Sequence, residues 1–273
     1  MASVWRLLQH GPGTGPWNMG VDEALLRSAA RSGVATLRLY TWRGPWLSLG
    51  YSQAALASER IRALEKAGVG LVQRSTGGRA VLHGADLTYA VAAPEDDLAA
   101  GLRGSYDQVA RALLLALRSL GVDAQRVDAR APAPGRSVFD CFARAAGDEI
   151  CVAGRKLAGS AQRRVGGALL QHGSLRLEPD EAAVAASAGL GRNGATSLRE
   201  VGCGVSEEAL RAACVEAFAQ VLDAELAPDQ LTRDELECAE RRPARGPRAF
   251  DEASKGARRQ ARQGQNPTGN PQG

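Results

Sequence analysis

The sequence contains few cysteines, and their arrangement fits neither a disulfide framework nor a zinc site. There are five in 273 residues, an odd number, with no Cys-x-x-Cys pair and no histidine at ligand spacing from any of them. Paired, regularly spaced cysteines are the signature of disulfide-rich and structural zinc folds. We therefore predict free thiols and no metal site. The five cysteines are Cys141, Cys151, Cys203, Cys214 and Cys238.

Long apolar runs and nucleotide-binding motifs are also missing. The most apolar stretch, residues 109–117, is interrupted by Arg111 and ends at Arg118, so it is far too short to span a bilayer. Residues 1–8 lack the basic-then-apolar pattern of an export signal. No Gly-x-Gly-x-x-Gly follows a predicted strand, and no phosphate-loop or His-Glu-x-x-His motif is present. We expect a cytoplasmic protein without a membrane partner.

The excess of positive charge is concentrated at the C-terminal end. The formal net charge is +4 and the pI is about 9.0. Residues 241–273 hold eight basic and two acidic side chains, a net +6, which leaves −2 for residues 1–240. A basic segment rich in Gln, Gly and Pro cannot bury enough apolar surface to offset its ordering entropy. We predict one folded domain over 1–240, large enough to be a catalytic domain, a disordered tail over 241–273, and no nucleic-acid partner.

Apolar periodicity and turn signals define the expected elements. Apolar residues at helical spacing, with stop signals such as Gly68 and Gly121, indicate helices. Runs rich in β-branched and aromatic residues, separated by glycine turns, indicate strands. Helices are predicted at residues 18–31, 58–66, 105–120, 181–186 and 207–222. Strands are predicted at residues 36–41, 46–51, 70–74, 80–92, 148–153, 156–162 and 168–177.

The order of these elements predicts the fold class. Most strands are joined to the next by a hairpin, including one that turns at Gly154, and helices separate groups of strands. This order favours an α+β fold, with a largely antiparallel mixed sheet and helices packed outside it, over a repeating βαβ fold. The strands at 70–74 and 80–92 are expected to flank a tight turn at Gly77-Gly78, because paired glycines supply the positive φ of a sharp reversal.

Three short segments hold the residue types that could carry chemistry. The first is the turn Arg74-Ser75-Thr76-Gly77-Gly78-Arg79, followed by His83. The second is the pair Cys141-Phe142. The third is Gly154-Arg155-Lys156-Leu157-Ala158-Gly159-Ser160-Ala161-Gln162. A thiolate exchanges readily with a thioester, so a cysteine nucleophile suits an acyl donor that arrives as a thioester and needs no ATP.

These segments resemble signatures of the lipoate–protein ligase and octanoyltransferase superfamily. The first and third match in order, as do the stretch from Asn18 to Leu25, the stretch from Pro45 to Tyr51, and Leu170-Gln171-His172-Gly173-Ser174-Leu175. The resemblance covers roughly residues 5–225. It implies the α/β catalytic fold shared with biotin–protein ligases. The Cys-Phe pair is similar to that of the carrier-protein-dependent octanoyltransferases, whereas ATP-dependent lipoate ligases usually have an Asn-Asp type sequence there.

The resemblance also implies roles for individual residues. Cys141 would be the nucleophile, and Lys156 would lower the pKa of its thiol and bind the oxyanion that develops on the acyl carbonyl. His172 and the strand residue Cys151 are interpreted as structural. Gly84 departs from the acidic residue that relatives commonly carry after the histidine, which weakens a proton-transfer role for His83. The implied substrate-binding residues are Arg74, Ser75, Thr76, Gly77, Gly78, His83, Gly159, Ser160 and Ala161.

The implied reaction moves a medium-chain acyl group, octanoyl, from octanoyl-acyl carrier protein to a lysine of a lipoyl protein, without a cofactor. The acceptor would be a lipoyl domain of a 2-oxoacid dehydrogenase or a glycine-cleavage H protein. Three alternatives stay open. They are an ATP- and Mg-dependent lipoate ligase, an amidotransferase acting between lipoyl carrier proteins, and a non-catalytic acyl-binding homologue that would be indifferent to loss of Cys141.

Overall fold

The computed structural model describes residues 3–53, 56–127, 149–187 and 195–241. The predicted nucleophile Cys141 and nearly all of the predicted tail lie outside these residues. The domain boundary at 240 and the disorder of the tail therefore stay predictions. The loop that was expected to carry Cys141 back toward Lys156 also lies outside the described part of the chain.

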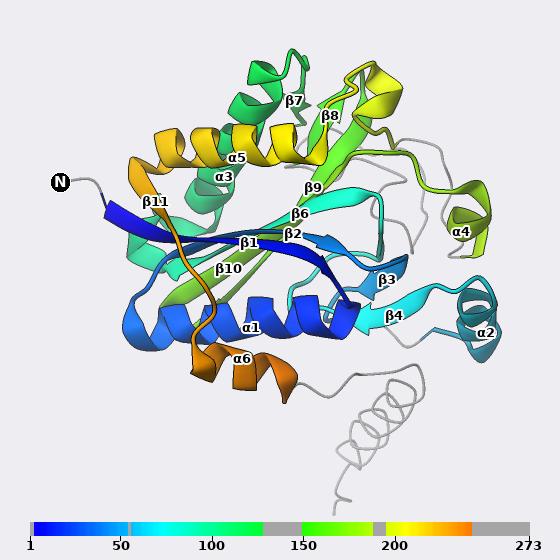
Figure 1. The fold of residues 1–273 in the computed structure, drawn as a ribbon, viewed down its shortest axis with the longest axis horizontal. Helices are drawn as coiled ribbons and strands as arrows, with labels where there is room; N and C mark the ends of the chain where they lie inside the picture. The colour runs from blue at the N-terminus through cyan, green and yellow to red at the C-terminus, as the bar shows by residue number, and fades with distance from the viewer. Residues whose placement is uncertain (1–2, 54–55, 128–148, 188–194, 242–273) are drawn as a thin grey trace, which may run out of the picture.

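An eight-stranded sheet runs through the centre of the described chain (Figure 1). The two pairs β11–β1 and β1–β2 are parallel, and the five other neighbouring pairs are antiparallel. This confirms the predicted α+β class with a largely antiparallel mixed sheet. In spatial order the strands are β11 (Ala224–Pro228), β1 (Ser3–Gly13), β2 (Thr36–Trp42), β6 (Asp86–Pro94), β10 (Ala168–Arg176), β9 (Arg155–Val165), β8 (Ile150–Val152) and β7 (Gln125–Arg126).

A smaller three-stranded sheet corrects two expectations. Its order is β4 (Gly70–Gln73), β3 (Trp46–Leu49) and β5 (Val81–His83), so β3 lies between the strands that were predicted to flank a tight turn. The predicted strand at 80–92 is also wrong as one element, because it divides into β5 and β6, which belong to different sheets. The chain bends at Gly84, whose φ is 134°. A side chain there would be strained and would press on the backbone of Gly44 and Pro45.

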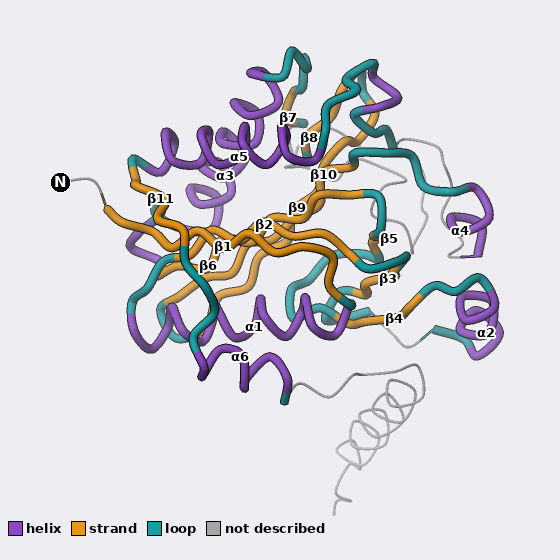
Figure 2. Tube along the Cα trace, in the orientation of Figure 1, coloured by secondary structure: helices purple, strands orange, loops and turns teal. Residues whose placement is uncertain are grey.

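Helices cover both faces of the large sheet (Figure 2). One face carries α1 and α6, the other carries α3 and α5, and α2 and α4 lie beside the small sheet (Figure 1). The predicted helices are all present, and the bounds of α2 and α5 agree with the prediction to the residue. The helices are α1 (Gly15–Ser32), α2 (Ser58–Lys66), α3 (Gly101–Ser119), α4 (Ala182–Ser187), α5 (Glu207–Leu222) and α6 (Arg233–Glu240), with short 3-10 turns at Glu95–Asp97 and Arg199–Val201.

Two apolar cores, one on each face of the large sheet, hold these layers together. Leu25 of α1 packs with Leu170 of β10 in one core, and Leu113 of α3 packs with Phe218 of α5 in the other. Burial of such side chains stabilises the domain by roughly 1.5–3 kcal/mol each. Among the described helices, none is both long enough and apolar enough to cross a bilayer. Polar residues of the same elements face a cavity between the two sheets.

Candidate active site

A cavity of about 340 Å³ brings together most of the predicted site residues. Its walls come from α1, β2, β3, β5, the 74–79 loop and the adjacent strands β9 and β10. Antiparallel pairing places Ser160 opposite Gly173 and Ala161 opposite His172, so two motifs distant in sequence share one wall. The predicted residues that line the cavity are Arg74, Gly78, His83, Lys156, Gly159, Ser160 and Ala161.

Lys156 is buried in this cavity, with only 2% of its side chain exposed. The β8–β9 hairpin positions it, turning at Ala153 and Gly154, which both have positive φ. Its ammonium Nζ donates a hydrogen bond to Oε1 of Glu149, which also lines the cavity. A buried ammonium paired with a carboxylate keeps a fixed position, which is what a donor to a developing oxyanion requires. Sequence reasoning missed Glu149.

The chain around the segment that contains Cys141 is tied to Glu149, the partner of this lysine. The backbone N–H of Val127 donates to the carbonyl oxygen of Glu149 at 2.9 Å, so residues 127 and 149 are neighbours. Residues 128–148 leave and rejoin the described chain at this pair. Cys141 is eight residues from Glu149, and a chain of that length spans at most about 27 Å. The attachment of the segment therefore permits the predicted contact between Cys141 and the cavity.

The other cysteines do not compete for the role of nucleophile. None of the four in the described residues lines the 340 Å³ cavity. Cys151 is buried in β8, as predicted, and burial raises the pKa of its thiol, with the nearby Glu149 charge adding to the effect. Burial also raises the pKa of Cys214 to about 12. Both thiols are protonated near neutral pH and are weak nucleophiles.

Arg74 shapes the loop next to the cavity. Its guanidinium donates to the carbonyl oxygens of Ser48, Gly77 and Arg79, at 3.0, 2.8 and 2.6 Å. These bonds tie the loop to β3 and leave Gly78 at the cavity wall. Three predicted substrate-binding residues of this loop do not line the cavity, namely Ser75, Thr76 and Gly77. Arg74 thus builds the wall through main-chain contacts.

A carboxylate–histidine pair lies on the β5 side of the cavity. His83 Nδ1 is 2.8 Å from Asp86 Oδ2, and its Nε2 is 2.9 Å from the Ser48 hydroxyl. The ring stacks on Trp42 with a centroid separation of 4.0 Å. Burial alone would raise the pKa of Asp86, but His83, together with hydrogen bonds from Ser174 and the Gly84 backbone, holds it below its usual value. The acidic partner of His83 is therefore present, two residues after the Gly84 position where sequence reasoning looked for it.

A second carboxylate–histidine pair links α1 to the 74–79 loop. His172 Nδ1 is 2.8 Å from Asp22 Oδ2, and its Nε2 is 2.7 Å from the Thr76 hydroxyl. Asp22 also accepts from Arg38 at 2.7 Å and from the Tyr40 hydroxyl at 2.8 Å. Burial alone would raise the pKa of Asp22, but His172 and Arg38 hold it below its ordinary value. These hydrogen bonds hold the 74–79 loop against β10 and α1. This structural role fits the interpretation of His172 as a structural residue.

Asp22→Asn is expected to destabilise the protein by about 3–5 kcal/mol at pH 7, because it leaves the fully buried Arg38 guanidinium without its carboxylate. The folded-state pKa of Asp22 is depressed, so its contribution is full above the unfolded value of about 4 and is lost as pH falls through the lower folded value. Urea unfolding of wild type and variant at pH 7 and pH 3 should show a gap that narrows in acid.

Asp229→Asn is the matched control for this prediction. Asp229 pairs with Arg6 at the surface, where its side chain is 48% exposed, and such pairs contribute about 0–1 kcal/mol. A decrease of less than 1 kcal/mol in the free energy of unfolding of Asp22→Asn at pH 7 would contradict the stabilising role of the buried Asp22–Arg38 pair.

Comparison with solved structures assigns the fold to the class of lipoate–protein ligases. A T. acidophilum protein assigned as a lipoate protein ligase, solved with bound lipoic acid, superposes with a TM-score of 0.73 at 25% identity, covering 87% of this chain and 93% of its own. A lipoate-protein ligase A bound with ATP gives 0.72 at 23% identity, covering 92% and 96%, and supports the fold alone.

Residues 15–221 match the Lipoyl protein ligase A/B catalytic domain, and the chain belongs to this family. An octanoyltransferase LipM of Kyrpidia tusciae is 40% identical over 87% of this chain and 94% of its own length. The octanoyltransferase LipM of Symbiobacterium thermophilum is 38% identical over 86% and 92%. The family that the signature segments predicted is confirmed.

Proposed function

We propose that this protein is an octanoyltransferase, which moves an octanoyl group from octanoyl-acyl carrier protein to a lysine of a lipoyl-domain protein through a thioester on Cys141. The observation that carries the proposal is its similarity, at 40% identity across nearly the whole length, to a protein named octanoyltransferase. The cavity that holds the buried Lys156 supports it, because it offers a concave site with a positioned cation.

In the first half-reaction the Cys141 thiolate attacks the thioester carbonyl of the donor. The new carbon–sulfur bond forms as the carbonyl oxygen becomes an oxyanion, which the Lys156 ammonium stabilises by charge and hydrogen bonding. Collapse of this intermediate breaks the carbon–sulfur bond to the carrier, whose thiolate leaves and takes up a proton. The octanoyl group stays on Cys141 as a thioester, with its chain beside Gly78 and the β9–β10 wall.

In the second half-reaction the neutral amine of the acceptor lysine attacks the same carbonyl. The amide bond forms and the bond to Cys141 breaks, which regenerates the Cys141 thiolate. The proton lost by the amine balances the one taken up by the carrier thiolate in the first half-reaction. A thioester is a sufficiently activated acyl donor, so the two half-reactions need neither ATP nor a metal ion. The closely similar relatives are named octanoyltransferases, which favours this reaction over the ATP-dependent ligase alternative.

Transfer assays with and without ATP test this function. Purified protein mixed with a lipoyl domain and octanoyl-acyl carrier protein should raise the mass of the domain by one octanoyl group without ATP. Transfer only from free octanoate with ATP and Mg would favour a ligase. Transfer only from an octanoylated lipoyl protein would favour the amidotransferase, and no transfer from any donor would favour an acyl-binding homologue.

Gly159→Ala is expected to lower kcat for this transfer by about 10–100-fold while the fold is kept. A Cβ at residue 159 would lie 2.7 Å from the Lys156 ammonium, which must then move away from its position by the carbonyl. Displacement of a positioned group by about 1 Å can cost up to about 100-fold in rate. Gly11→Ala in β1 is the matched control, since a Cβ there meets nothing within 4 Å. Equal activity of the two variants would contradict the role of Lys156.

A further inference from the structure

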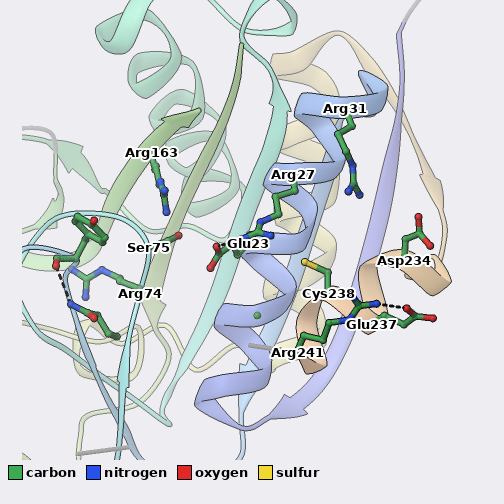
Figure 3. Close-up of a pocket in the computed structure, with 13 residues that line it drawn as sticks. Glu23, Arg27, Arg31, Arg74, Ser75, Arg163, Asp234, Glu237, Cys238 and Arg241 are labelled. Atoms are coloured by element: carbon green, nitrogen blue, oxygen red, sulfur yellow. Dashed lines mark hydrogen bonds and ion pairs between the residues drawn. The ribbon is translucent and has the colours of Figure 1, made fainter. Parts of the chain in front are cut away.

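A second cavity, of about 630 Å³, lies between α1, α6, the end of β9 and the turn after β4 (Figure 3). We call it the arginine groove and define it by six of its lining residues. Figure 3 shows Arg163 on one side, and Arg27 and Arg31 along α1 on the other. The groove is distinct from the 340 Å³ cavity but shares Arg74 with it. The defining residues are Arg27, Arg31, Tyr51, Ser75, Arg163 and Arg241.

Two elements run from the 340 Å³ cavity, which we call the acyl cavity, into the groove. On α1, Met19 lines the cavity, whereas Arg27 and Arg31, eight and twelve residues further along the helix, line the groove. Twelve helical residues correspond to about 18 Å. On β9, Ala161 lines the cavity and Arg163, two residues later on the same face of the strand, lines the groove. A long flexible arm could therefore follow these elements from groove to cavity.

The groove carries an excess of positive charge that is not neutralised internally. Its lining includes five arginines and three acidic residues. Two of the acidic side chains are in ion pairs with groove arginines, Glu23 with Arg27 and Glu237 with Arg241. Within the described residues, Arg31 and Arg163 form no ion pair. The two are thus available to an anionic ligand, one on each side of the groove (Figure 3).

The groove also has the residue types of a protein interface. Tyr51 is 65% exposed, and the Arg163 guanidinium lies 5.8 Å from the centre of its ring. Tyrosine and arginine are the residues most enriched, with tryptophan, at the energetic centres of interfaces. An exposed aromatic ring beside an unneutralised cation is therefore suited to contact with a protein surface of negative charge.

The sequence that follows the groove residue Arg241 is also positively charged. Arg241, one of the lining residues, is the last described residue, and residues 242–273 carry seven basic and two acidic side chains, a net +5. Long-range attraction of an acidic partner increases with such charge and raises the rate of association.

We propose that the arginine groove docks the acidic carrier protein that delivers the acyl group. The phosphodiester of the carrier's prosthetic arm would lie between Arg31 and Arg163, and the arm would follow α1 to place its thioester in the acyl cavity. The identity of the donor rests on the proposed function. The docking of an anionic, phosphodiester-bearing protein rests on the groove itself.

The experiment compares two charge-reversed double variants of the full chain. R31E/R163E changes the groove, and R103E/R111E makes the same change of charge on α3, on the opposite face of the sheet. Binding of fluorescently labelled holo-acyl carrier protein, which carries no acyl group, is measured by anisotropy. We expect at least a 10-fold rise in Kd for R31E/R163E, less than a 2-fold change for R103E/R111E, and a weaker salt dependence in the groove variant.

A second readout separates docking from chemistry. The ratio of kcat/KM for octanoyl-acyl carrier protein to that for octanoyl-N-acetylcysteamine, a small thioester without phosphate or protein, should fall at least 10-fold in R31E/R163E. Carrier binding by R31E/R163E within 2-fold of wild type would overturn the proposal. Weakened binding of a lipoyl domain, with carrier binding unchanged, would also overturn it. Absence of transfer from both donors, with carrier binding still dependent on Arg31 and Arg163, would refute the proposed function and leave the docking site intact.

Discussion

Cys141→Ala is expected to abolish octanoyl transfer without altering the fold. Loss of the thiol removes the proposed attachment point for the acyl group, so the rate should fall to background. Removal of the nucleophile from enzymes with a catalytic triad lowers kcat by at least about 10⁴-fold, and we expect a loss of that size. Transfer to a lipoyl domain, followed by mass spectrometry, measures the effect, and circular dichroism checks the fold.

Cys151→Ala provides the matched control for this substitution. Cys151 is buried in β8 with a raised thiol pKa, and it lies outside the acyl cavity. Its variant should retain transfer, with a modest loss of stability from the lost packing. Comparable loss of transfer in both variants, or retention in Cys141→Ala, would refute the assignment of the nucleophile.

Lys156→Met is expected to lower kcat for acylation by about 10²–10³-fold, the usual loss when one oxyanion donor is removed. Methionine is about as long and also buries well, so it fills the space that the Lys156 side chain leaves. Loss of the ammonium should also raise the pKa of the Cys141 thiol, because a nearby cation stabilises a thiolate. The pH dependence of iodoacetamide alkylation at Cys141 should therefore shift to higher pH.

The alkylation profile separates this role from a purely structural one. Lys66→Met, at the exposed end of α2, is the matched control and should leave both the rate and the profile unchanged. A rate for Lys156→Met within about 3-fold of wild type, with an unshifted alkylation profile, would show that the buried ammonium acts on neither the thiol nor the oxyanion.

Local patterns predicted the elements whose signals are local. Helix α5 has a Ser206 cap at its start, and the β8–β9 hairpin has Gly154 at its turn. Strand β1 was missed because Gly11 and Pro12 interrupt its apolar run. Helix α6 was not predicted, although Thr232 and Glu235 at its start form a capping box, which is a local signal.

The buried partners of the site could not be predicted in the same way. Asp22 meets His172 across 150 residues of sequence because α1 packs on β10, and Glu149 meets Lys156 because the β8–β9 hairpin returns the chain. The Gly84 bend illustrates the same limit of local patterns: an apolar run predicts one strand, whereas the packing of two sheets divides it and brings Asp86 to His83.

Intact-mass spectrometry of the purified protein after mixing with octanoyl-acyl carrier protein, without ATP, tests the central claim most directly. The account predicts a gain of one octanoyl group that hydroxylamine removes and that is absent in Cys141→Ala. Absence of the adduct, with octanoyl transfer to a lipoyl domain appearing only when ATP and free octanoate are supplied, would contradict the thioester mechanism and move the protein to the ligases.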